Sequence, residues 1–417
     1  MDERPGINLI GHMSTNLGLG VAARNTARLL EDCGHPFAAI DIPTASMPHR
    51  ADLTWESRFH DPHKPLPFAV NLFHMNPPEI AAEVRLKPAW LESQTTWNAL
   101  VPFWELPQLP DNWLPVIGRM DTVLAPTQFV ADVVRRSAPD VDVVHFPQTV
   151  YLPDGITPDR VAWGLADDAT VYVFSFDLNS DPARKNPWGA IEAYRMARSE
   201  IGDAATKLVI RANNATTAMG KRHLSELHAA ASADPTIVIV DKALTYREVL
   251  SLYASADAFV SLHRAEGLGL GLLESMMLGT PAIATAYSGN MDFMNEENSL
   301  MVDYTLVPAI GADRGSYAAH KIGGEQVWAE PNIEMAAAHM VRLARDPALR
   351  QRLSEVAAES ARATQSSAER YAAINHLLER AAVSPRASRL AELRSGHALI
   401  WRARRIVGTQ LRQLGLR

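Results

Sequence analysis

The chain has 417 residues, of which 47% are hydrophobic and 21% charged, and its formal charge is −7 at pH 7. This length indicates two or three domains with large cores, and the acidic balance argues against nucleic-acid binding by the chain as a whole. The single cysteine, Cys33, excludes disulfide scaffolds, thiolate zinc sites and paired-cysteine redox chemistry. The first residues lack the apolar core of a signal peptide, and no apolar run is long enough to span a membrane. Both features predict a cytoplasmic protein.

Strands and helices are expected to alternate along the first part of the chain. The apolar pattern predicts a helix over 21–31 and strands at 7–10, 37–41, 68–73, 97–103, 122–125 and 141–146. Such alternation favours a parallel sheet covered by helices. We therefore predict a first domain over 1–160. Residues 147–168, which are rich in Pro, Gly and Asp, are the predicted linker between this domain and the next.

A second alternating series follows the linker. It predicts strands at 170–176, 207–211, 236–240, 258–262 and 281–285, with helices from 187 and near 221–232, 246–254 and 270–278. Mostly helical, Ala-rich sequence occupies 332–383. We predict a second domain over 161–370 and C-terminal helices over 371–417. Because ligands of open α/β sheets bind where the strands end, the loops after the strands hold the candidate site residues.

The strongest motif lies in residues 263–281. A predicted strand ends at Leu262, a Gly-rich loop follows, and a helix then runs to about Gly279. Glycines let a ligand approach the backbone, and the start of a helix offers free N–H groups to an anion. Glu266 in the loop and Glu274 in the helix can direct one carboxylate at a sugar and the other at a ribose diol. A carboxylate near the helix dipole is the structural alternative for Glu266, but it explains Glu274 on a largely apolar helix poorly.

Glu266 and Glu274 form a Glu-x7-Glu pattern, and residues 260–294 resemble family 4 of the retaining glycosyltransferases, also called group 1. The resemblance extends over 7–380 and is most specific between 170 and 294. It implies the GT-B fold, an α/β architecture of two Rossmann-like domains facing each other across a cleft, with a C-terminal helical tail. It also implies that the first Glu contacts the donor sugar and the second binds the nucleotide ribose. The further donor contacts implied in this loop are Gly267, Leu268, Gly269 and Leu270.

Two adjacent cations, Arg184 and Lys185, follow the strand that ends near Asp177. Asn186 can cap the next helix, with Pro187 at its first position, so the cations lie where a helix dipole favours negative charge. One Arg guanidinium can bind two phosphate oxygens at once, and Lys supplies a mobile positive charge. The pair therefore predicts a diphosphate site. Two solvated cations in a loop are the alternative. The resemblance implies that this pair binds the donor diphosphate and stabilises it as it leaves, although the usual spacing of the two cations is wider.

The loop after the first predicted strand contains Asn16, Gly18 and Gly20. The glycine spacing, with Asp41 ending the next strand, is similar to a dinucleotide-binding fingerprint and would indicate an NAD(P)-dependent oxidoreductase. However, six residues separate Gly11 from Gly18, whereas that fingerprint follows its strand directly. The longer loop resembles the first loop of family 4 enzymes, which implies donor contacts for the two glycines and an acceptor contact for Asn16.

Further candidates end other strands of the first domain. Trp104-Glu105 stands where many family 4 enzymes carry a His-Asp pair, and it resembles a bacterial subset with a Trp-Glu-Leu-Pro segment. We predict a catalytic or acceptor contact for Glu105, whereas Trp104 is either a packing residue or a sugar platform. His74 is either an acceptor contact or a structural residue, and His145 is expected to be structural.

The remaining donor contacts are expected in the loops of the second domain. They are Arg211, Lys242, Leu244, Ser288, Gly289 and Asn290. In the family the loop around 242–244 contacts the base through its backbone, and Ser-Gly-Asn replaces a more usual Gly-Gly whose N–H groups can bind the diphosphate or sugar. No pair of His residues at metal-ligand spacing and no Asp-x-Asp motif follows a strand, so we predict no metal and no cofactor beyond the nucleotide sugar.

Residues 384–417 hold eight arginines and one acidic residue, Glu392. Their apolar residues recur at helical spacing, which predicts a basic amphipathic helix at an anionic membrane surface; packing on protein or disorder are the alternatives. Together the features predict a retaining enzyme that moves a hexose from a nucleoside-diphosphate sugar to a glycan or lipid-linked acceptor in bacterial polysaccharide or glycolipid synthesis. It would act in the cytoplasm or peripherally at the inner face of the membrane. A non-catalytic GT-B subunit that binds a glycan or a partner protein is the alternative.

Overall fold

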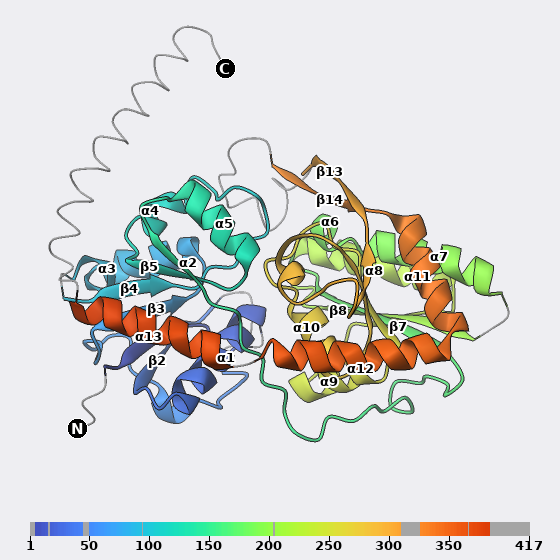
Figure 1. Ribbon diagram of the computed structural model, residues 1–417, viewed down its shortest axis with the longest axis horizontal. Coiled ribbons are helices and arrows are strands. Elements are labelled where there is room, and N and C mark those ends of the chain that lie inside the picture. The colour runs from blue at the N-terminus through green and yellow to red at the C-terminus, as the bar shows by residue number, and fades with distance from the viewer. Residues whose placement is uncertain are drawn as a thin grey trace, which may run out of the picture.

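The computed structural model describes residues 5–15, 17–44, 50–93, 95–202, 205–309, 326–365 and 367–383. Two α/β lobes lie side by side, the first coloured blue to teal and the second green to orange in Figure 1. Each lobe is built on a six-stranded sheet. This arrangement confirms the predicted pair of Rossmann-like domains.

The first sheet has the strand order β2-β1-β3-β4-β5-β6, and all its neighbouring strands are parallel. Its strands are β1 (Ile7–Gly11), β2 (Phe37–Asp41), β3 (Val70–His74), β4 (Trp97–Leu100), β5 (Thr122–Ala125) and β6 (Asp142–His145). The connections contain α1 (Gly18–Asp32), η1 (Glu56–Arg58), α2 (Pro77–Leu86), α3 (Ala89–Glu92), α4 (Leu114–Ile117) and α5 (Gln128–Ser137). The central strands β1 and β3 are buried along their whole length, as expected for strands covered on both faces. Strand β4 stops short of the predicted end at 103 because Pro102 has no N–H to continue the ladder.

The second sheet has the order β12-β11-β10-β7-β8-β9. Its strands are β7 (Thr170–Asp177), β8 (Thr206–Asn213), β9 (Ile237–Val240), β10 (Ala258–Ser261), β11 (Ala282–Thr285) and β12 (Leu300–Val302). Its helices are α6 (Pro182–Lys185), α7 (Pro187–Ile201), α8 (Ala218–Ala233), α9 (Tyr246–Ala254), α10 (Leu270–Met277), η2 (Ser288–Asp292), α11 (Ile333–Arg345) and α12 (Pro347–Ala363). A two-stranded antiparallel ribbon of β13 (Tyr304–Pro308) and β14 (Val327–Pro331) was not predicted, and β13 is largely exposed.

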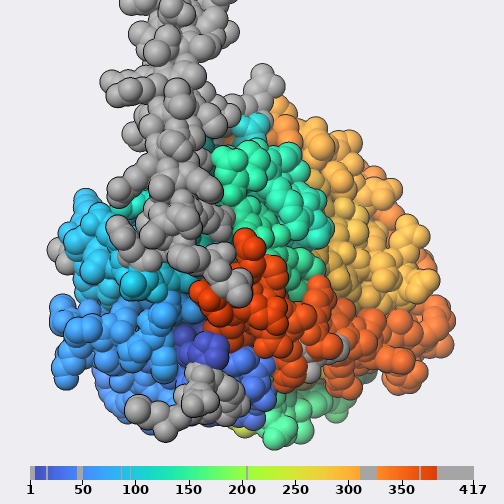
Figure 2. Space-filling model, turned by 60° about the vertical axis from the view of Figure 1, so that its left-hand side comes forward, coloured from blue at the N-terminus to red at the C-terminus, as the bar shows by residue number. Residues whose placement is uncertain are grey.

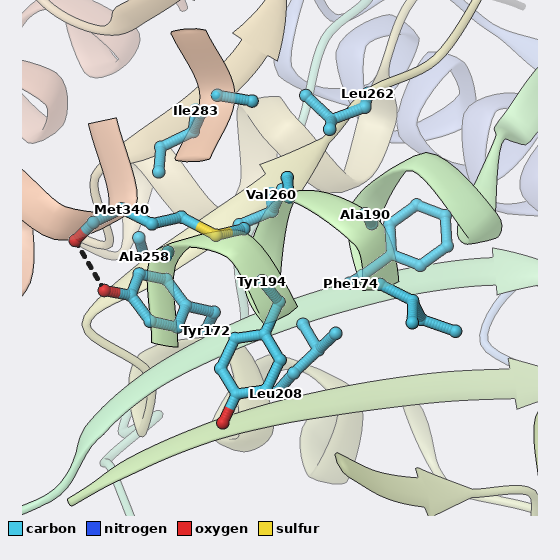
Figure 3. Packing of buried hydrophobic residues seen from close by; sticks show 14 of the residues in the cluster. Tyr172, Phe174, Ala190, Tyr194, Leu208, Ala258, Val260, Leu262, Ile283 and Met340 are labelled. Atoms are coloured by element: carbon cyan, nitrogen blue, oxygen red, sulfur yellow. Dashed lines mark hydrogen bonds between the residues drawn. The ribbon is translucent and has the colours of Figure 1, made fainter. Parts of the chain in front are cut away.

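One core of the second lobe lies between the sheet and helices α7 and α11. Tyr172 on β7 and Tyr194 on α7 meet edge to face, with their ring centroids 6.1 Å apart (Figure 3). The Tyr172 hydroxyl donates to the carbonyl of Met340 on α11 at 2.6 Å, so the buried phenol is not left without a partner. This packing fixes strand β7, whose carboxyl end carries cavity residues described below.

Helix α13 (Ser367–Val383) leaves the second lobe and packs on the first. Its residues Ile374 and Leu377 join the cluster that contains Ile7 and Leu9 of β1, and Figure 2 shows its red surface beside the blue first lobe. The predicted boundaries at 160 and 370 stay predictions, but the packing assigns α13 to the first lobe. The basic tail at 384–417 lies outside the described residues. None of the helices described above combines the length and apolar character needed to cross a membrane.

Candidate active site

A cavity of about 550 Å³ lies between the two lobes. Phe103, Trp104 and Glu105 after β4 form part of one wall, and the other walls come from the loops after β1 and β3 of the first lobe and after β7 and β10 of the second. In each sheet these two strands are neighbours although they are not consecutive in the chain. The chain leaves the two strands of such a pair in opposite directions, so a crevice opens at the carboxyl ends of these strands. The two crevices share one cavity, and its volume suits a small-molecule ligand.

Glu266 meets both predicted cations at this cavity. Its Oε1 lies 2.5 Å from Nζ of Lys185 and its Oε2 lies 3.3 Å from Nη1 of Arg184. Burial alone would raise the pKa of Glu266, but the charges of Lys185 and Arg184 outweigh burial and lower it to about 2. The carboxylate is therefore ionised at any working pH, and three of the predicted catalytic residues form one cluster.

The fourth predicted catalytic residue, Glu105, joins this cluster from the first lobe. Its Oε1 lies 3.4 Å from Nη2 of Arg184, whose Nη1 also donates to the carbonyl of Ala265 at 2.8 Å. The predicted cap is confirmed: the Asn186 side chain accepts a bond from the N–H of Gly189 at 3.1 Å. Asn186 has a left-handed φ of 55°, which Asn tolerates better than most residues. This turn ends the short helix α6 and holds its two cations toward the cavity.

The predicted Gly-rich loop lines the cavity from Glu266 to Leu270. Gly269 has a φ of 86°, in the left-handed region that favours glycine, and helix α10 begins directly after it. No side chain caps this helix start. The N–H groups of Leu272 and Leu273 bond to the Gly269 carbonyl, whereas those of Leu270 and Gly271 have no side-chain acceptor at this cavity wall, and such a helix start binds anions.

Residues Ser288, Gly289 and Asn290 support this loop instead of lining the cavity. The Ser288 hydroxyl accepts from the N–H of Glu266 at 2.7 Å, and the Gly289 N–H donates to the Glu266 carbonyl at 2.9 Å. A Cβ at Gly289 would lie 2.3 Å from the Gly267 carbonyl oxygen, so only glycine fits. In the free protein the Gly289 N–H is thus already bonded, and the expected donor contact through it stays a prediction. Asn290 is buried and bonds to His263 at 3.1 Å.

Glu274 lies one turn into α10, behind the cavity floor. It is 4% exposed and accepts a bond from the Tyr246 hydroxyl at 2.8 Å. Burial raises the pKa of Glu274 to about 7, although Tyr246 and Arg211 act to lower it. Arg211 donates to the hydroxyl of Ser175 at 3.2 Å, and Ser175 itself lines the cavity. Glu274 and Arg211 thus form a second layer, and the sequence had not indicated Tyr246.

Replacing Glu274 by Gln should remove a pH-dependent loss of stability. Between about pH 4.5 and 7 the Glu274 carboxyl group loses its proton in the unfolded chain but keeps it in the folded protein. The free energy of unfolding therefore falls as pH rises, by about 3 kcal/mol in total. Gln does not titrate and can still accept the Tyr246 bond. Urea unfolding of both proteins at pH 5 and pH 8 measures the difference. Glu192→Gln, on the exposed face of α7, is the control; equal slopes for E274Q and wild type would contradict the raised pKa.

Two predicted acceptor residues are not in the described lining. His74 is fully buried beside Phe103, with ring centroids 5.8 Å apart, and burial lowers its pKa to about 3. Its ring is therefore neutral and covered by Phe103, which faces the cavity instead. Asn16 lies outside the described residues. Of the two acceptor candidates among the described residues, Glu105 lines the cavity and His74 does not.

Lys242 and Leu244 also lie away from the described lining. They follow β9, which is the edge strand of its sheet and stands two strands away from the β7–β10 crevice. The Nζ of Lys242 instead lies 5.2 Å from the ring centroid of Trp163. In the first loop Gly18 lines the cavity, whereas a Cβ at Gly20 would lie 2.5 Å from the Thr15 carbonyl. Gly20 therefore permits close packing of α1 on its loop.

Sequence reasoning missed part of the first-lobe wall. Asn76 and Glu79 line the cavity at the start of α2. They form a capping box, and Asn76 also accepts from the N–H of Phe103 at 3.0 Å. An Asn followed three residues later by Glu, directly after a predicted strand, is the sequence signal that could have found them. Trp104 packs on Trp113 at a centroid distance of 4.7 Å and is 2% exposed, and it also borders the cavity, so both of its expected roles stay predictions.

Several contacts hold the lobes together beside the cavity. The Thr127 hydroxyl donates to the Gly267 carbonyl at 3.0 Å. His145 bridges Asp292 of the second lobe at 2.9 Å and Glu369 of α13 at 3.1 Å, which agrees with its expected structural role. Within the described ranges, no group of three or more His, Cys, Asp or Glu side chains is arranged to hold a metal ion.

Comparison with known proteins found a family model that matches part of the chain and solved structures of the same fold. Residues 182–360 match the family of glycosyl transferases group 1. The match includes the Arg184–Lys185 pair, Glu266 and Glu274, so it supports the predicted resemblance. No curated protein sequence is significantly similar to the chain.

Solved structures show that the chain has the GT-B fold. Sucrose-phosphate synthase from Thermosynechococcus elongatus matches with a TM-score of 0.64 and 14% identity, over 90% of this chain and 99% of that one. A glycosyltransferase from Rickettsia africae matches with a TM-score of 0.63 and 13% identity, over 92% and 100%. The pneumococcal O-GlcNAc transferase GtfA, in complex with UDP and GlcNAc, matches with a TM-score of 0.51 and 14% identity, over 76% of this chain. The match covers 57% of GtfA, so this chain spans little more than half of that protein.

Proposed function

We propose that this protein is a retaining glycosyltransferase that moves a hexose from a nucleoside-diphosphate sugar to a hydroxyl of a glycan or lipid-linked acceptor. The observation that carries the proposal is the meeting of Arg184, Lys185 and Glu266 at the uncapped start of α10, inside the cavity between the lobes. Without ligand, the carboxylates neutralise the two cations. A diphosphate can take over the cations, and Glu266 is then free to accept bonds from sugar hydroxyls.

The chemistry follows from where charge develops. The bond between the anomeric carbon and the diphosphate oxygen breaks, and Arg184, Lys185 and the α10 dipole stabilise the leaving charge. The acceptor oxygen attacks the same face of the anomeric carbon, and its proton passes to the departing phosphate. Glu266 orients the donor sugar. We assign no protein nucleophile, and the proposal requires neither a metal nor another cofactor.

The second layer behind the floor would bind the nucleoside. We propose that the ribose hydroxyls contact Glu274 in place of the Tyr246 hydroxyl, which donates to that carboxylate in the free protein. The bound UDP and GlcNAc of GtfA make UDP the first nucleotide to test. We further propose that the reaction serves bacterial polysaccharide or glycolipid synthesis in the cytoplasm, with residues 384–417 at the inner face of the membrane.

Thermal unfolding with a ligand panel tests the donor class. The panel holds UDP, GDP, ADP and dTDP, their common sugar conjugates and NAD(P)H, each with and without magnesium. One nucleoside diphosphate at 100 times its Kd should stabilise the fold by about 2.7 kcal/mol, independently of magnesium. The matching nucleoside monophosphate is the control and should stabilise less, because it lacks the second phosphate. A shift with NAD(P)H alone would indicate an oxidoreductase, and no shift at all would favour a non-catalytic subunit.

A further inference from the structure

The first-lobe side of the cavity carries a carboxylate that donor binding and bond cleavage do not use. Glu79 lies in the first turn of α2, lines the cavity beside Asn76 and Phe103, and has a side chain that is 38% exposed. It belongs to a different lobe from Lys185 and Glu266. A ligand that touches Glu79 therefore approaches the reaction centre from the side opposite the Gly-rich loop.

Two hydrogen bonds hold the Glu79 carboxylate in place. Its Oε2 accepts from the N–H of Asn76 at 2.9 Å, and its Oε1 lies 3.0 Å from Nε2 of His12. The other ring nitrogen of His12 lies 2.7 Å from the carbonyl of Ile42. Each ring nitrogen thus faces an oxygen acceptor, and although burial acts to lower the pKa of His12, the bond to Glu79 and its charge raise it. Through these contacts His12 orients the Glu79 carboxylate, with lone pairs left for a donor in the cavity.

The rest of the first-lobe wall is apolar or acidic. Besides Asn76, the described lining from this lobe consists of Glu79 and Glu105 with apolar or glycine positions, among them Leu17, Leu19 and Phe103. Both cations of the described lining come from the second lobe, and both already contact carboxylates. A phosphate group entering from the first lobe would meet carboxylates, whereas a hydroxyl can donate to one. The carbon face of a sugar or an aliphatic group can pack on Phe103 and the leucines.

We propose that Glu79 accepts a hydrogen bond from a hydroxyl of the acceptor, and that the part of the acceptor entering the cavity is uncharged. This inference rests on the proposed function, because only a group-transfer reaction has an acceptor. His12 is a positioning residue that acts through Glu79. The apolar neighbours exclude water from the contact, and the fixed carboxylate selects compounds that present a hydroxyl.

Saturation-transfer NMR in the presence of the stabilising nucleoside diphosphate tests this site. The probes are the methyl glycosides of glucose, galactose, mannose and N-acetylglucosamine, each compared with the corresponding sugar 6-phosphate at millimolar concentration. We expect binding of at least one neutral glycoside and no binding of its phosphate. Glu79→Gln should weaken the glycoside about tenfold or more, since the bond to a charged acceptor is lost. Glu79→Lys should shift the preference toward the phosphate.

Matched variants separate a binding role from a structural one. Glu83→Gln changes a carboxylate one turn further along α2, where Glu83 contacts Lys87 at 2.7 Å outside the described lining, and it should bind the glycoside as the wild type does. His12→Gln keeps Glu79 but removes the imidazole ring that positions it, and it should weaken the glycoside less than Glu79→Gln. Thermal unfolding and unchanged affinity for the nucleoside diphosphate show that each variant is folded.

Three results would overturn the inference. They are binding of a 6-phosphate as tight as that of its neutral glycoside, equal glycoside affinities of Glu79→Gln and the wild type, and no binding of any neutral glycoside. If no nucleoside diphosphate binds, the proposed function fails instead. Glycoside binding to the free protein and its loss in Glu79→Gln would then still report on Glu79 separately.

Discussion

Replacing Glu266 by Gln is expected to lower sugar transfer by about 10²–10³-fold. The amide has nearly the same shape, but it lacks the charge that pairs with Lys185 at 2.5 Å and Arg184 at 3.3 Å. It also presents an N–H₂ group where a sugar hydroxyl needs an acceptor. Affinity for the nucleoside diphosphate should stay the same or increase, because a carboxylate no longer neutralises the two cations that bind the diphosphate. Turnover is measured as nucleoside diphosphate released, and affinity by calorimetry.

The control for this variant is Glu296→Gln, on an exposed position shortly after η2. It should leave both turnover and affinity unchanged. If Glu266→Gln turned over close to the wild-type rate, Glu266 would have no role in the transfer step. A large loss of nucleotide affinity with unchanged turnover at saturation would mean that Glu266 supports donor binding and not the transfer step.

Replacing Arg184 by Met is expected to destabilise the protein by about 3–5 kcal/mol. The Arg184 side chain is only 6% exposed, and its removal takes a cation away from Glu105 and the Ala265 carbonyl and leaves Lys185 as the cation beside Glu266. The pKa of Glu266, held at about 2 by Lys185 and Arg184 against burial, should rise. Met fills a similar volume, so the loss reports on charge more than on packing. Urea unfolding at pH 7 measures the effect.

Lys185→Met is the matched comparison, because the Lys185 side chain is 20% exposed and less of its charge is buried. It should cost less stability than Arg184→Met. Both variants should bind the nucleoside diphosphate about ten- to a hundredfold more weakly, since each removes a charged contact. Unfolding of Arg184→Met at the wild-type urea concentration would show that the buried pairs add nothing to stability. Unchanged affinity in both variants would place the diphosphate elsewhere.

Local sequence patterns predicted most elements of the second lobe closely. The predicted helix at 246–254 coincides with α9, and the predicted helix at 270–278 differs from α10 by one residue. These segments have strong apolar periodicity and clear ends, such as the Thr245 capping box before α9. The Gly-rich loop and the Arg184–Lys185 pair were also predicted from local sequence, because each lies in the loop that follows a recognisable strand.

The sequence by itself determined that the chain forms two α/β units and which loops carry charged and glycine residues, because these features depend on neighbours within a few positions. Only the tertiary structure decided which loops meet. Strand order places Lys242 beyond an edge strand and brings Glu105 to Arg184, and helix α13 returns to the first lobe although it follows the second. These outcomes depend on contacts between residues far apart in the chain, whose pairing is set by how whole sheets and helices pack and not by local spacing.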